Sequence, residues 1–268
     1  MKRYRVIGFV VVLFGLAGLL GCTQPPPEPT EPRRYALGEI LIGVDSGVRQ
    51  ISDQYTCPEN MALIPGGEIR SEWVVENSSF VRRLGDPRQL KPYCMDRYEY
   101  PNKRFVLPRT RVSYVEARQL CKEAGKHLCT EDEWEFACAG PEGQPYVYGS
   151  ERESWRCNTD GAKVGDFESI APAGSHNGCF NRWGVFDLNG NVSEWVDAIS
   201  FGREGGTAIV RGGTAWPAEY GQSCFSRHAH PIYEDHWADD GLRCCVEPGI
   251  PGIDNTPGPD ETPDSPAE

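Results

Sequence analysis

Apolar residues recur at helical spacing in two segments of the chain. The first opens with a capping-box sequence at residues 113–116 (Ser-Tyr-Val-Glu), and its apolar positions continue up to Gly125. The second opens with another capping box at residues 130–133 and places Trp134 and Cys138 four residues apart on one face. These patterns predict two short amphipathic helices.

Short β-like segments, such as residues 61–64 and 208–211, alternate elsewhere with turns rich in Gly, Asn, Asp and Pro. The chain contains 30 Gly and 22 Pro beside 7 Trp and 11 Tyr, which is typical of a loop-rich domain with large aromatic anchors. At 268 residues and 39% apolar, it is long enough for one folded domain with tails. Its formal net charge of −12 argues against nucleic acid as a partner.

The longest apolar run extends from Val6 to Leu20, after three basic residues, and its 15 residues are fewer than the ~20 that a spanning helix needs. It leads into Leu20-Gly21-Cys22, which resembles a bacterial lipobox. The resemblance implies that residues 1–21 are a cleaved signal peptide and that Cys22 carries acyl chains of the palmitate type. Because Thr23 rather than Asp follows Cys22, it also implies anchoring in the outer membrane. The alternative is an uncleaved signal anchor.

Both ends of the mature chain have compositions unsuited to a packed core. Residues 22–56 are interpreted as a lipidated, Pro-rich tether and lead-in that favours extended polyproline geometry. Residues 248–268 mix Pro, Gly, Asp and Glu with almost no apolar residues, which predicts a disordered acidic tail. The folded domain is therefore expected at residues 57–247.

Eleven cysteines occur in the chain, and an exported protein meets an oxidising compartment. With Cys22 assigned to the lipid, ten remain, which predicts five disulfides. Zinc–thiolate binding is the alternative, although no Cys-x-x-Cys pair is present. Cys244 and Cys245 are adjacent, so on a strand they would face opposite ways, and each needs its own distant partner.

Several motifs occur in an order that resembles the formylglycine-generating-enzyme (sulfatase-modifying factor) family. The segments that carry the resemblance are residues 61–67 (Met-Ala-Leu-Ile-Pro-Gly-Gly), 96–99 (Asp-Arg-Tyr-Glu), 112–117, 124–135, 184–196, 211–214 (Arg-Gly-Gly-Thr) and 241–244 (Gly-Leu-Arg-Cys). It implies one α+β domain over residues 57–247, low in regular secondary structure, disulfide-rich and related in shape to C-type lectins. The resemblance implies the bridges Cys121–Cys244 and Cys138–Cys224, and for the remaining cysteines we propose Cys57–Cys94, Cys157–Cys179 and Cys129–Cys245.

Residues 187–194 hold two carboxylates around a turn rich in Asn and Gly, and oxygen ligands of this kind suit Ca²⁺. The segment resembles the family's structural calcium loop. The implied ligands are the carboxylates of Asp187 and Glu194 and the carbonyls of Gly190 and Val192. The alternative is a polar turn with Glu194 facing solvent. A second family site maps to the Asn158 side chain and the Thr159 carbonyl, with its acidic partner, Asp166, one position out of register.

Formylglycine formation in the family requires two thiols, spaced Cys-x4-Cys just after a Gly-Gly-Ser turn, which bind copper. Here Thr214 follows the two glycines, and the first cysteine after it is Cys224, which the resemblance assigns to a structural bridge. A cuprous ion prefers thiolate or thioether ligands. We therefore expect neither copper nor sulfatase-type cysteine oxidation, and assign no catalytic residue.

One other cluster could carry chemistry. His228 and His230 face the same way on an extended chain, and acidic residues follow at 234–240. A His–carboxylate metal site and a polar, partly exposed loop are the two interpretations. The expected function is noncatalytic binding of a peptide, glycan or envelope partner, and the alternative is a metal-dependent oxidoreductase with a non-cysteine site. The residues expected at the binding cleft are Trp216, Tyr220, Arg227, His228 and His230.

Overall fold

The computed structural model describes residues 54–76, 79–161, 169–200, 206–216, 222–233 and 238–251. The chain divides into two compact units, Met1–Gly43 and Val44–Glu268, and all described residues lie in the second. The predicted signal peptide, Cys22, nearly all of the tether and most of the acidic tail lie outside the described residues.

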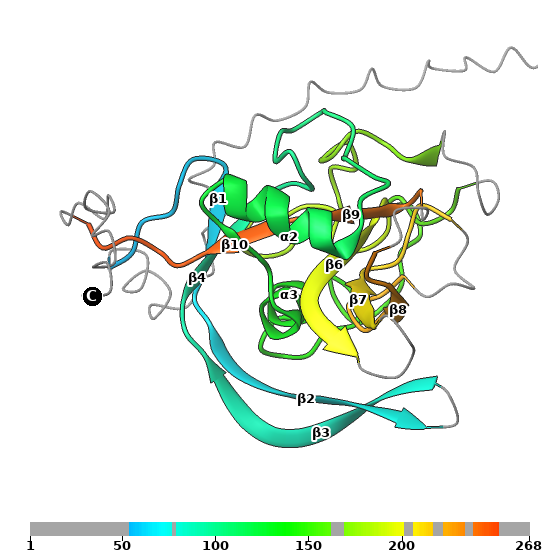
Figure 1. Cartoon of the computed structure of the whole chain (residues 1–268), viewed down its shortest axis with the longest axis horizontal. Helices are drawn as coiled ribbons and strands as arrows, with labels where there is room; N and C mark the ends of the chain where they lie inside the picture. Colours follow the sequence, from blue (N-terminus) through cyan, green and yellow to red (C-terminus); the bar gives the residue numbers. More distant parts are fainter. Residues whose placement is uncertain are drawn as a thin grey trace, which may run out of the picture. The chain divides into compact units, whose positions relative to one another are not determined.

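Short strands and two helices make up the described part of the domain (Figure 1). In chain order these are β1 (Met61–Ile64), β2 (Gly67–Glu76), β3 (Ser79–Leu90), β4 (Tyr93–Asp96), α2 (Tyr114–Glu123), β5 (His127–Leu128), α3 (Glu131–Ala139), β6 (Ser193–Ser200), β7 (Thr207–Arg211), β8 (Arg227–Pro231), β9 (Asp240–Leu242) and β10 (Cys244–Val246). They form a sheet in the order β1-β4-β10-β5, a second in the order β8-β7-β6-β9, and the ribbon β2-β3. Within the second sheet, β6 and β9 run parallel. The α+β class and the low helix content are therefore confirmed.

Both helices begin where the capping boxes predict. Ser113 is the N-cap of α2, and its hydroxyl accepts a hydrogen bond from the Glu116 amide at 3.2 Å. At the start of α3 the Thr130 hydroxyl accepts a hydrogen bond from the Glu133 amide, and the Glu133 carboxylate accepts one from the Thr130 amide. The capping box is therefore complete. Gly125 follows α2 with φ 70°, a conformation that suits glycine after a helix.

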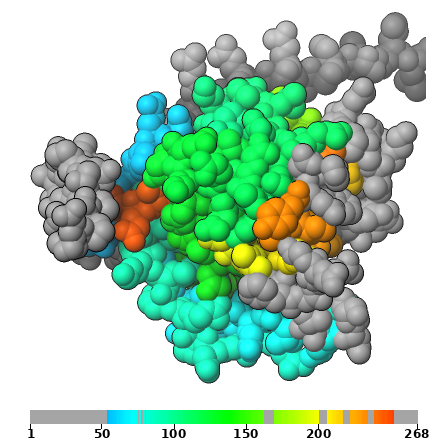
Figure 2. All heavy atoms as spheres, in the orientation of Figure 1, coloured from blue at the N-terminus to red at the C-terminus, as the bar shows by residue number. Residues whose placement is uncertain are grey.

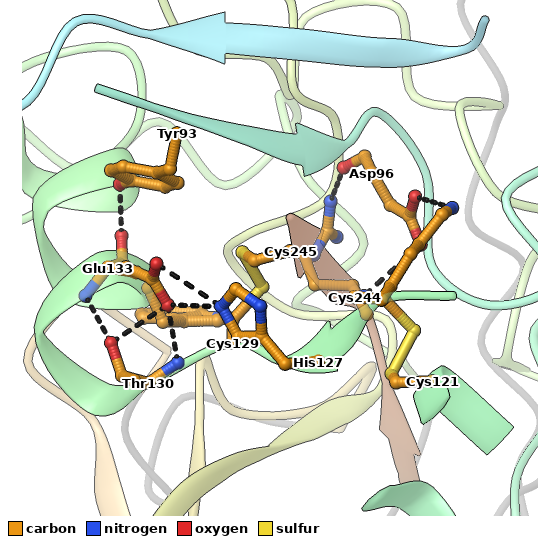
Figure 3. Close-up of a disulfide and its surroundings, with 12 residues drawn as sticks. Tyr93, Asp96, Cys121, His127, Cys129, Thr130, Glu133, Cys244 and Cys245 are labelled. Atoms are coloured by element: carbon orange, nitrogen blue, oxygen red, sulfur yellow. Dashed lines mark hydrogen bonds and ion pairs between the residues drawn. A yellow bond between two sulfur atoms is a disulfide. The ribbon is translucent and has the colours of Figure 1, made fainter. Parts of the chain in front are cut away.

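Strand β10 separates two hydrophobic cores. Its adjacent cysteines lie on opposite faces because side chains alternate along a strand. Cys244 packs in one core with Cys121 and Trp195, whereas Cys245 packs in the other with Cys129 and Trp134. Figure 3 shows the two disulfides that leave this strand for separate partners.

All ten cysteines from Cys57 to Cys245 form disulfides, in the five proposed pairs. These are Cys57–Cys94, Cys121–Cys244, Cys129–Cys245, Cys138–Cys224 and Cys157–Cys179. The two bridges from β10 join residues 123 and 116 positions apart, so they restrict the unfolded chain more than short loops do. A domain with little regular structure gains much of its stability from such crosslinks.

The β2-β3 ribbon is an element that the hydrophobic pattern did not predict. It curves beneath α3 in Figure 1 and lies along the lower edge of the face shown in Figure 2. Its contact with α3 centres on the buried carboxylate of Glu135, which accepts hydrogen bonds from Trp73 Nε1 at 2.9 Å and Arg82 Nε at 3.1 Å. Arg211 of β7 donates to the same carboxylate at 2.8 Å. Burial alone would raise the pKa of Glu135, but its guanidinium and hydroxyl partners hold that pKa below its usual value.

Neither described helix combines the length and the apolar character that a membrane-crossing helix requires.

Candidate functional site

The predicted calcium segment, residues 187–194, is a buried turn that leads into β6. Asp187 and Asn191 adopt positive φ angles of 59° and 62°, and Gly190 has φ 78°. A Cβ atom on Gly190 would lie 2.2 Å from the carbonyl oxygen of Asn158, so this position admits only glycine. Glu194 is 1% exposed, which excludes the alternative in which it faces solvent.

Asn191 connects the predicted calcium ligands of residues 187–194 with those of the second predicted site, Asn158 and Thr159. Its backbone amide donates to the Asn158 carbonyl at 2.9 Å, and its side-chain oxygen accepts from Asn158 Nδ2 at 2.8 Å. Its Nδ2 donates to both carboxylate oxygens of Glu99, at 3.0 and 2.9 Å. Thr159, next to Asn158, is buried, whereas Asp166 lies outside the described residues.

Glu194 already has a cationic partner, the buried guanidinium of Arg243. Arg243 Nη2 donates to Glu194 Oε1 at 2.6 Å, and Nε donates to Oε2 at 2.7 Å. Trp134 Nε1 donates to Oε2 at 2.6 Å. Glu194 therefore accepts three hydrogen bonds, two of them from a charged fork.

Carboxylates outnumber guanidinium groups in this buried cluster. Glu99, Asp187 and Glu194 are at most 3% exposed, and Arg243 is their one fully buried guanidinium partner among the described residues. Burial raises the pKa of Glu99 well above its usual value, and the charges of Asp187 and Glu194 raise it further. Burial also raises the pKa of Asp187 to about 6, although the Gly174 amide donates to its Oδ2 at 2.5 Å.

The donor set fits a hard cation at Asp187 better than at Glu194. Asp187 is a buried carboxylate with no guanidinium hydrogen bond among the described residues, and its Oδ2 accepts from the Gly174 amide. Glu194 is occupied by Arg243 and Trp134. Of the predicted calcium ligands, Glu194 is therefore the one that already accepts hydrogen bonds from a guanidinium group and an indole.

The histidine cluster forms a hydrogen-bonded pair within the β8-β7-β6-β9 sheet. His230 Nδ1 lies 2.6 Å from Asp240 Oδ2, and the His230 ring meets Trp195 edge-on at 5.9 Å. His228 is exposed. Among the described residues, no three or more His, Cys, Asp or Glu side chains are arranged to hold a metal ion, and residues 234–237 lie outside that set.

Three of the residues expected at the binding cleft, Arg227, His228 and His230, lie on β8. Arg227 directs its guanidinium at Glu131, with Nε–Oε1 at 2.6 Å, and lies over the Trp73 ring at 5.5 Å. Trp216 is partly buried after the Gly-Gly-Thr turn, and Tyr220 lies outside the described residues. Arg227 therefore serves the packing of the β2-β3 ribbon and α3.

Two cavities of about 260 Å³ each instead flank the last turn of α3, residues 136–140. The first lies beside the Cys138–Cys224 bridge and is lined by three partly exposed aromatic residues, Tyr146, Tyr148 and Trp183. The two tyrosine rings stack with centroids 5.4 Å apart, and Trp183 stacks on Phe136 at 5.8 Å. The second cavity lies between this turn and the β2-β3 ribbon. Sequence reasoning missed both, because their walls come from segments far apart in the chain.

Comparison with known proteins agrees with the motifs and the fold. Residues 101–248 match the model of the sulfatase-modifying factor enzyme 1-like domain, which is more than half of the chain. The chain belongs to this family.

Relatives of this sulfatase-modifying-factor-like domain include proteins named as active and as inactive. It is 33% identical over 118 residues to the inactive C-alpha-formylglycine-generating enzyme 2 of Bos taurus, covering 41% of the chain and 39% of the relative. It is 36% identical over 100 residues to the formylglycine-generating enzyme of Streptomyces coelicolor, covering 33% of the chain and 31% of the relative. The matched regions thus span less than half of these relatives. The fold is also that of PvdO from Pseudomonas aeruginosa (TM-score 0.51, 18% identity, 72% of this chain and 97% of that one).

The turn that precedes the reactive thiols in the catalytic relatives is present in this sulfatase-modifying-factor-like domain. Gly212 and Gly213 have φ 89° and 76°, and the Gly212 carbonyl accepts from the Gly190 amide at 3.0 Å. The next cysteine along the chain, Cys224, is bonded to Cys138. The turn therefore connects by a hydrogen bond to residues 187–194, the predicted calcium segment.

The buried carboxyl of Asp239 gives the domain a testable pH dependence. Burial, followed by the charge of Asp240, raises the pKa of Asp239 to about 6, against the opposing effect of His230 and His228. Because the folded-state pKa exceeds the unfolded one, ionised Asp239 destabilises the domain above about pH 6, and the penalty falls as pH decreases toward 4. Asp239→Asn is expected to raise the free energy of unfolding by about 1–3 kcal/mol at pH ~7.5, with most of the gain lost by pH ~4.5.

Urea unfolding at both pH values measures this difference. Asp86→Asn, at an exposed position of β3, is the control and should change stability by less than about 0.5 kcal/mol at either pH. An equal effect of Asp239→Asn at the two pH values would contradict the assignment.

Proposed function

We propose that this protein is a lipid-anchored envelope protein whose domain binds a peptide or glycan of an envelope partner without catalysing formylglycine formation. The observation that carries the proposal is the use of every cysteine from Cys57 to Cys245 in a disulfide, because a bonded sulfur supplies no thiolate to copper. Similarity to a relative named as inactive supports the same conclusion.

The aromatic cavity beside the last turn of α3 is the binding site that we propose. Tyr146, Tyr148 and Trp183 are partly exposed at its wall, and rings of this kind supply large, rigid contact surfaces at low entropic cost. The Cys138–Cys224 bridge and the Phe136–Trp183 stack hold the wall in place. An oxidoreductase function has less support, because no three or more His, Cys, Asp or Glu side chains among the described residues are arranged to hold a metal ion.

A photo-crosslinking residue at Tyr148 tests this site in living cells. Substitution with p-benzoylphenylalanine is expected to yield a discrete crosslinked species, and Trp183→Ala in the same chain should reduce its yield at least tenfold, because the central aromatic contact is lost. Trp155→Ala is the matched control, since Trp155 is 70% exposed and lines neither cavity. An identical crosslinking pattern from the exposed Val115 position would count against the cavity.

The absence of formylglycine chemistry has its own assay. The purified protein, incubated with Cu(I), oxygen and a sulfatase-motif peptide, should leave the peptide cysteine unconverted by mass spectrometry. Aldehyde formation would overturn the noncatalytic assignment while leaving the crosslinking result to stand on its own.

We further propose structural calcium at Asp187 and the neighbouring carbonyls of Gly190 and Val192, with Asn158 and Thr159 beside them. The buried carboxylate excess around Asp187 supports a cation there. A ligand at 100 times its Kd stabilises the folded state by about 2.7 kcal/mol, which for a domain of this size is a rise in Tm of about 5–10 °C.

Thermal unfolding after EGTA dialysis, with and without about 1 mM CaCl2, measures this rise. Asp187→Asn is expected to abolish it, and asparagine tolerates the positive φ at that position. Mg²⁺ should have a smaller effect because it demands octahedral geometry. An unchanged Tm in the wild-type protein with calcium would remove this proposal.

The lipid anchor is the third part of the proposal and depends on Cys22. In cells, wild-type protein should fractionate with the outer membrane, and mass spectrometry should find an acylated cysteine as its first residue. Cys22→Ser is expected to block both acylation and cleavage, leaving a precursor that is larger by residues 1–21. Cleavage elsewhere with a free amino terminus would show an ordinary secreted protein.

A further inference from the structure

The acidic chain contains one strongly basic segment with an apolar centre. Residues 103–111 read Lys-Arg-Phe-Val-Leu-Pro-Arg-Thr-Arg, with four cations and no acid, in a chain whose formal net charge is −12. The three central side chains, Phe105, Val106 and Leu107, are 62%, 40% and 59% exposed. We call residues 103–111 the basic–apolar loop. In Figure 1 it follows the upper edge of the folded unit, near α2.

The fold holds this loop in one conformation. The Phe105 amide donates to the Ala173 carbonyl at 2.8 Å, and the Ala173 amide donates to the Val106 carbonyl at 2.9 Å. At the base, the Arg109 amide donates to the Tyr100 carbonyl at 2.8 Å. Pro108, the next residue after the three apolar ones, is buried. The exposed side chains are therefore presented by a fixed backbone.

The conformation is costly for its residue type. Phe105 has φ 62°, a region that bulky residues rarely adopt. Arg104 lies over the Phe105 ring at 4.7 Å and donates to Asn177 Oδ1 at 2.9 Å, which orients the cation beside the exposed ring. Strain of this kind persists only where the surroundings impose it, and it is concentrated at functional surfaces.

We propose that the basic–apolar loop inserts into the surface of a bilayer that contains anionic lipids. The exposed side chains of Phe105, Val106 and Leu107 match the acyl boundary, and the flanking cations Lys103, Arg104, Arg109 and Arg111 are exposed and carry the charge that lipid phosphates attract. Of these four, Arg109 also forms an ion pair with Glu116. Charge complementarity favours this occupant, because the four cations of the basic–apolar loop are attracted to an anionic surface.

The proposed anchor at Cys22 is compatible with this contact, although the loop does not depend on it. The 33 residues from Cys22 to Gln54 can extend to at most about 120 Å, which leaves the domain free to approach the bilayer that holds the lipid. A weak loop contact would then gain from the high local concentration that the tether creates. Contact of the basic–apolar loop with the bilayer would give the tethered domain a defined orientation at the membrane.

Flotation with vesicles tests the loop separately from the lipid. The unlipidated chain from Thr23 to Glu268 retains the whole compact unit Val44–Glu268 and all five disulfides. It is expected to float with vesicles of phosphatidylethanolamine and phosphatidylglycerol at about 7:3, and not with phosphatidylcholine alone. Raising NaCl from ~50 to ~500 mM should release most of the bound protein.

Two variants separate the apolar and charged contributions. Phe105→Asn with Leu107→Ser should reduce vesicle binding at least tenfold, and asparagine is suited to the positive φ at residue 105. Lys103→Gln with Arg111→Gln should reduce it several-fold and weaken its dependence on salt. Leu84→Ser removes the 81% exposed leucine of β3 and should leave binding unchanged. Near-UV circular dichroism confirms that each variant keeps the native fold.

The proposal fails if wild-type protein does not float with the anionic vesicles, or if Leu84→Ser lowers binding as much as the loop variants. It also fails if the loop variants bind vesicles normally but lose a crosslinked envelope protein, because the loop would then be a protein-docking surface. None of these outcomes bears on acylation of Cys22, which is measured independently.

Discussion

Three consecutive residues, Arg243, Cys244 and Cys245, hold the domain together. Arg243 contacts Glu194 of β6 through two hydrogen bonds, and its Nη1 and Nη2 donate to the backbone carbonyls of Asp96 at 3.0 Å and Phe186 at 2.9 Å. The cysteines then bond in opposite directions, to α2 and to the segment before α3. One short stretch of chain thus connects both larger sheets, both helices and the predicted calcium segment. Because a buried unpaired charge is far more costly than a buried pair, removing either Arg243 or Glu194 would destabilise the folded domain by leaving the other charge unpaired.

This arrangement has a direct consequence for the buried acids. Once Arg243 is committed to Glu194, its charge is largely satisfied, and Glu99 and Asp187 are left to amide donors from Asn191 and Gly174. Neutral donors compensate a buried carboxylate only in part, which is why the pKa values of both acids are raised. Protonation and a bound cation are the two ways to relieve that cost. At Gly190 the turn packs directly against the Asn158 carbonyl, which leaves no room for a side chain at this position.

The parts of the fold that depend on local chemistry were predictable. Ser113 and Thr130 mark the helix starts because a hydroxyl that caps a helix acts within three residues of its own position. The β2-β3 ribbon could not be predicted in this way, because it packs through Trp73, Arg82 and Glu135, charged and aromatic groups that leave no alternating pattern.

The candidate site also divides into a part that local sequence predicts and a part that it does not. The ligand types around Asp187 are visible in one short segment, whereas the aromatic cavity needs the last turn of α3 to meet Trp183, more than forty positions away. Arg227, expected at a cleft, lies against Glu131 because the ribbon brings Trp73 over it.

A domain with so few helices and strands presents its surfaces through loops, and loops carry function only when something fixes them. Here the fixing elements are covalent bonds and buried polar contacts. The Cys138–Cys224 disulfide lies beside the aromatic cavity, Asn191 connects Asn158 to the predicted calcium segment, and Ala173 forms two backbone hydrogen bonds with the basic–apolar loop. The sulfur atoms that a catalytic relative divides between structure and copper chemistry are all used for structure in this part of the chain. Since rigid loops lower the entropic cost of binding, crosslinks of this kind suit a surface that recognises a partner.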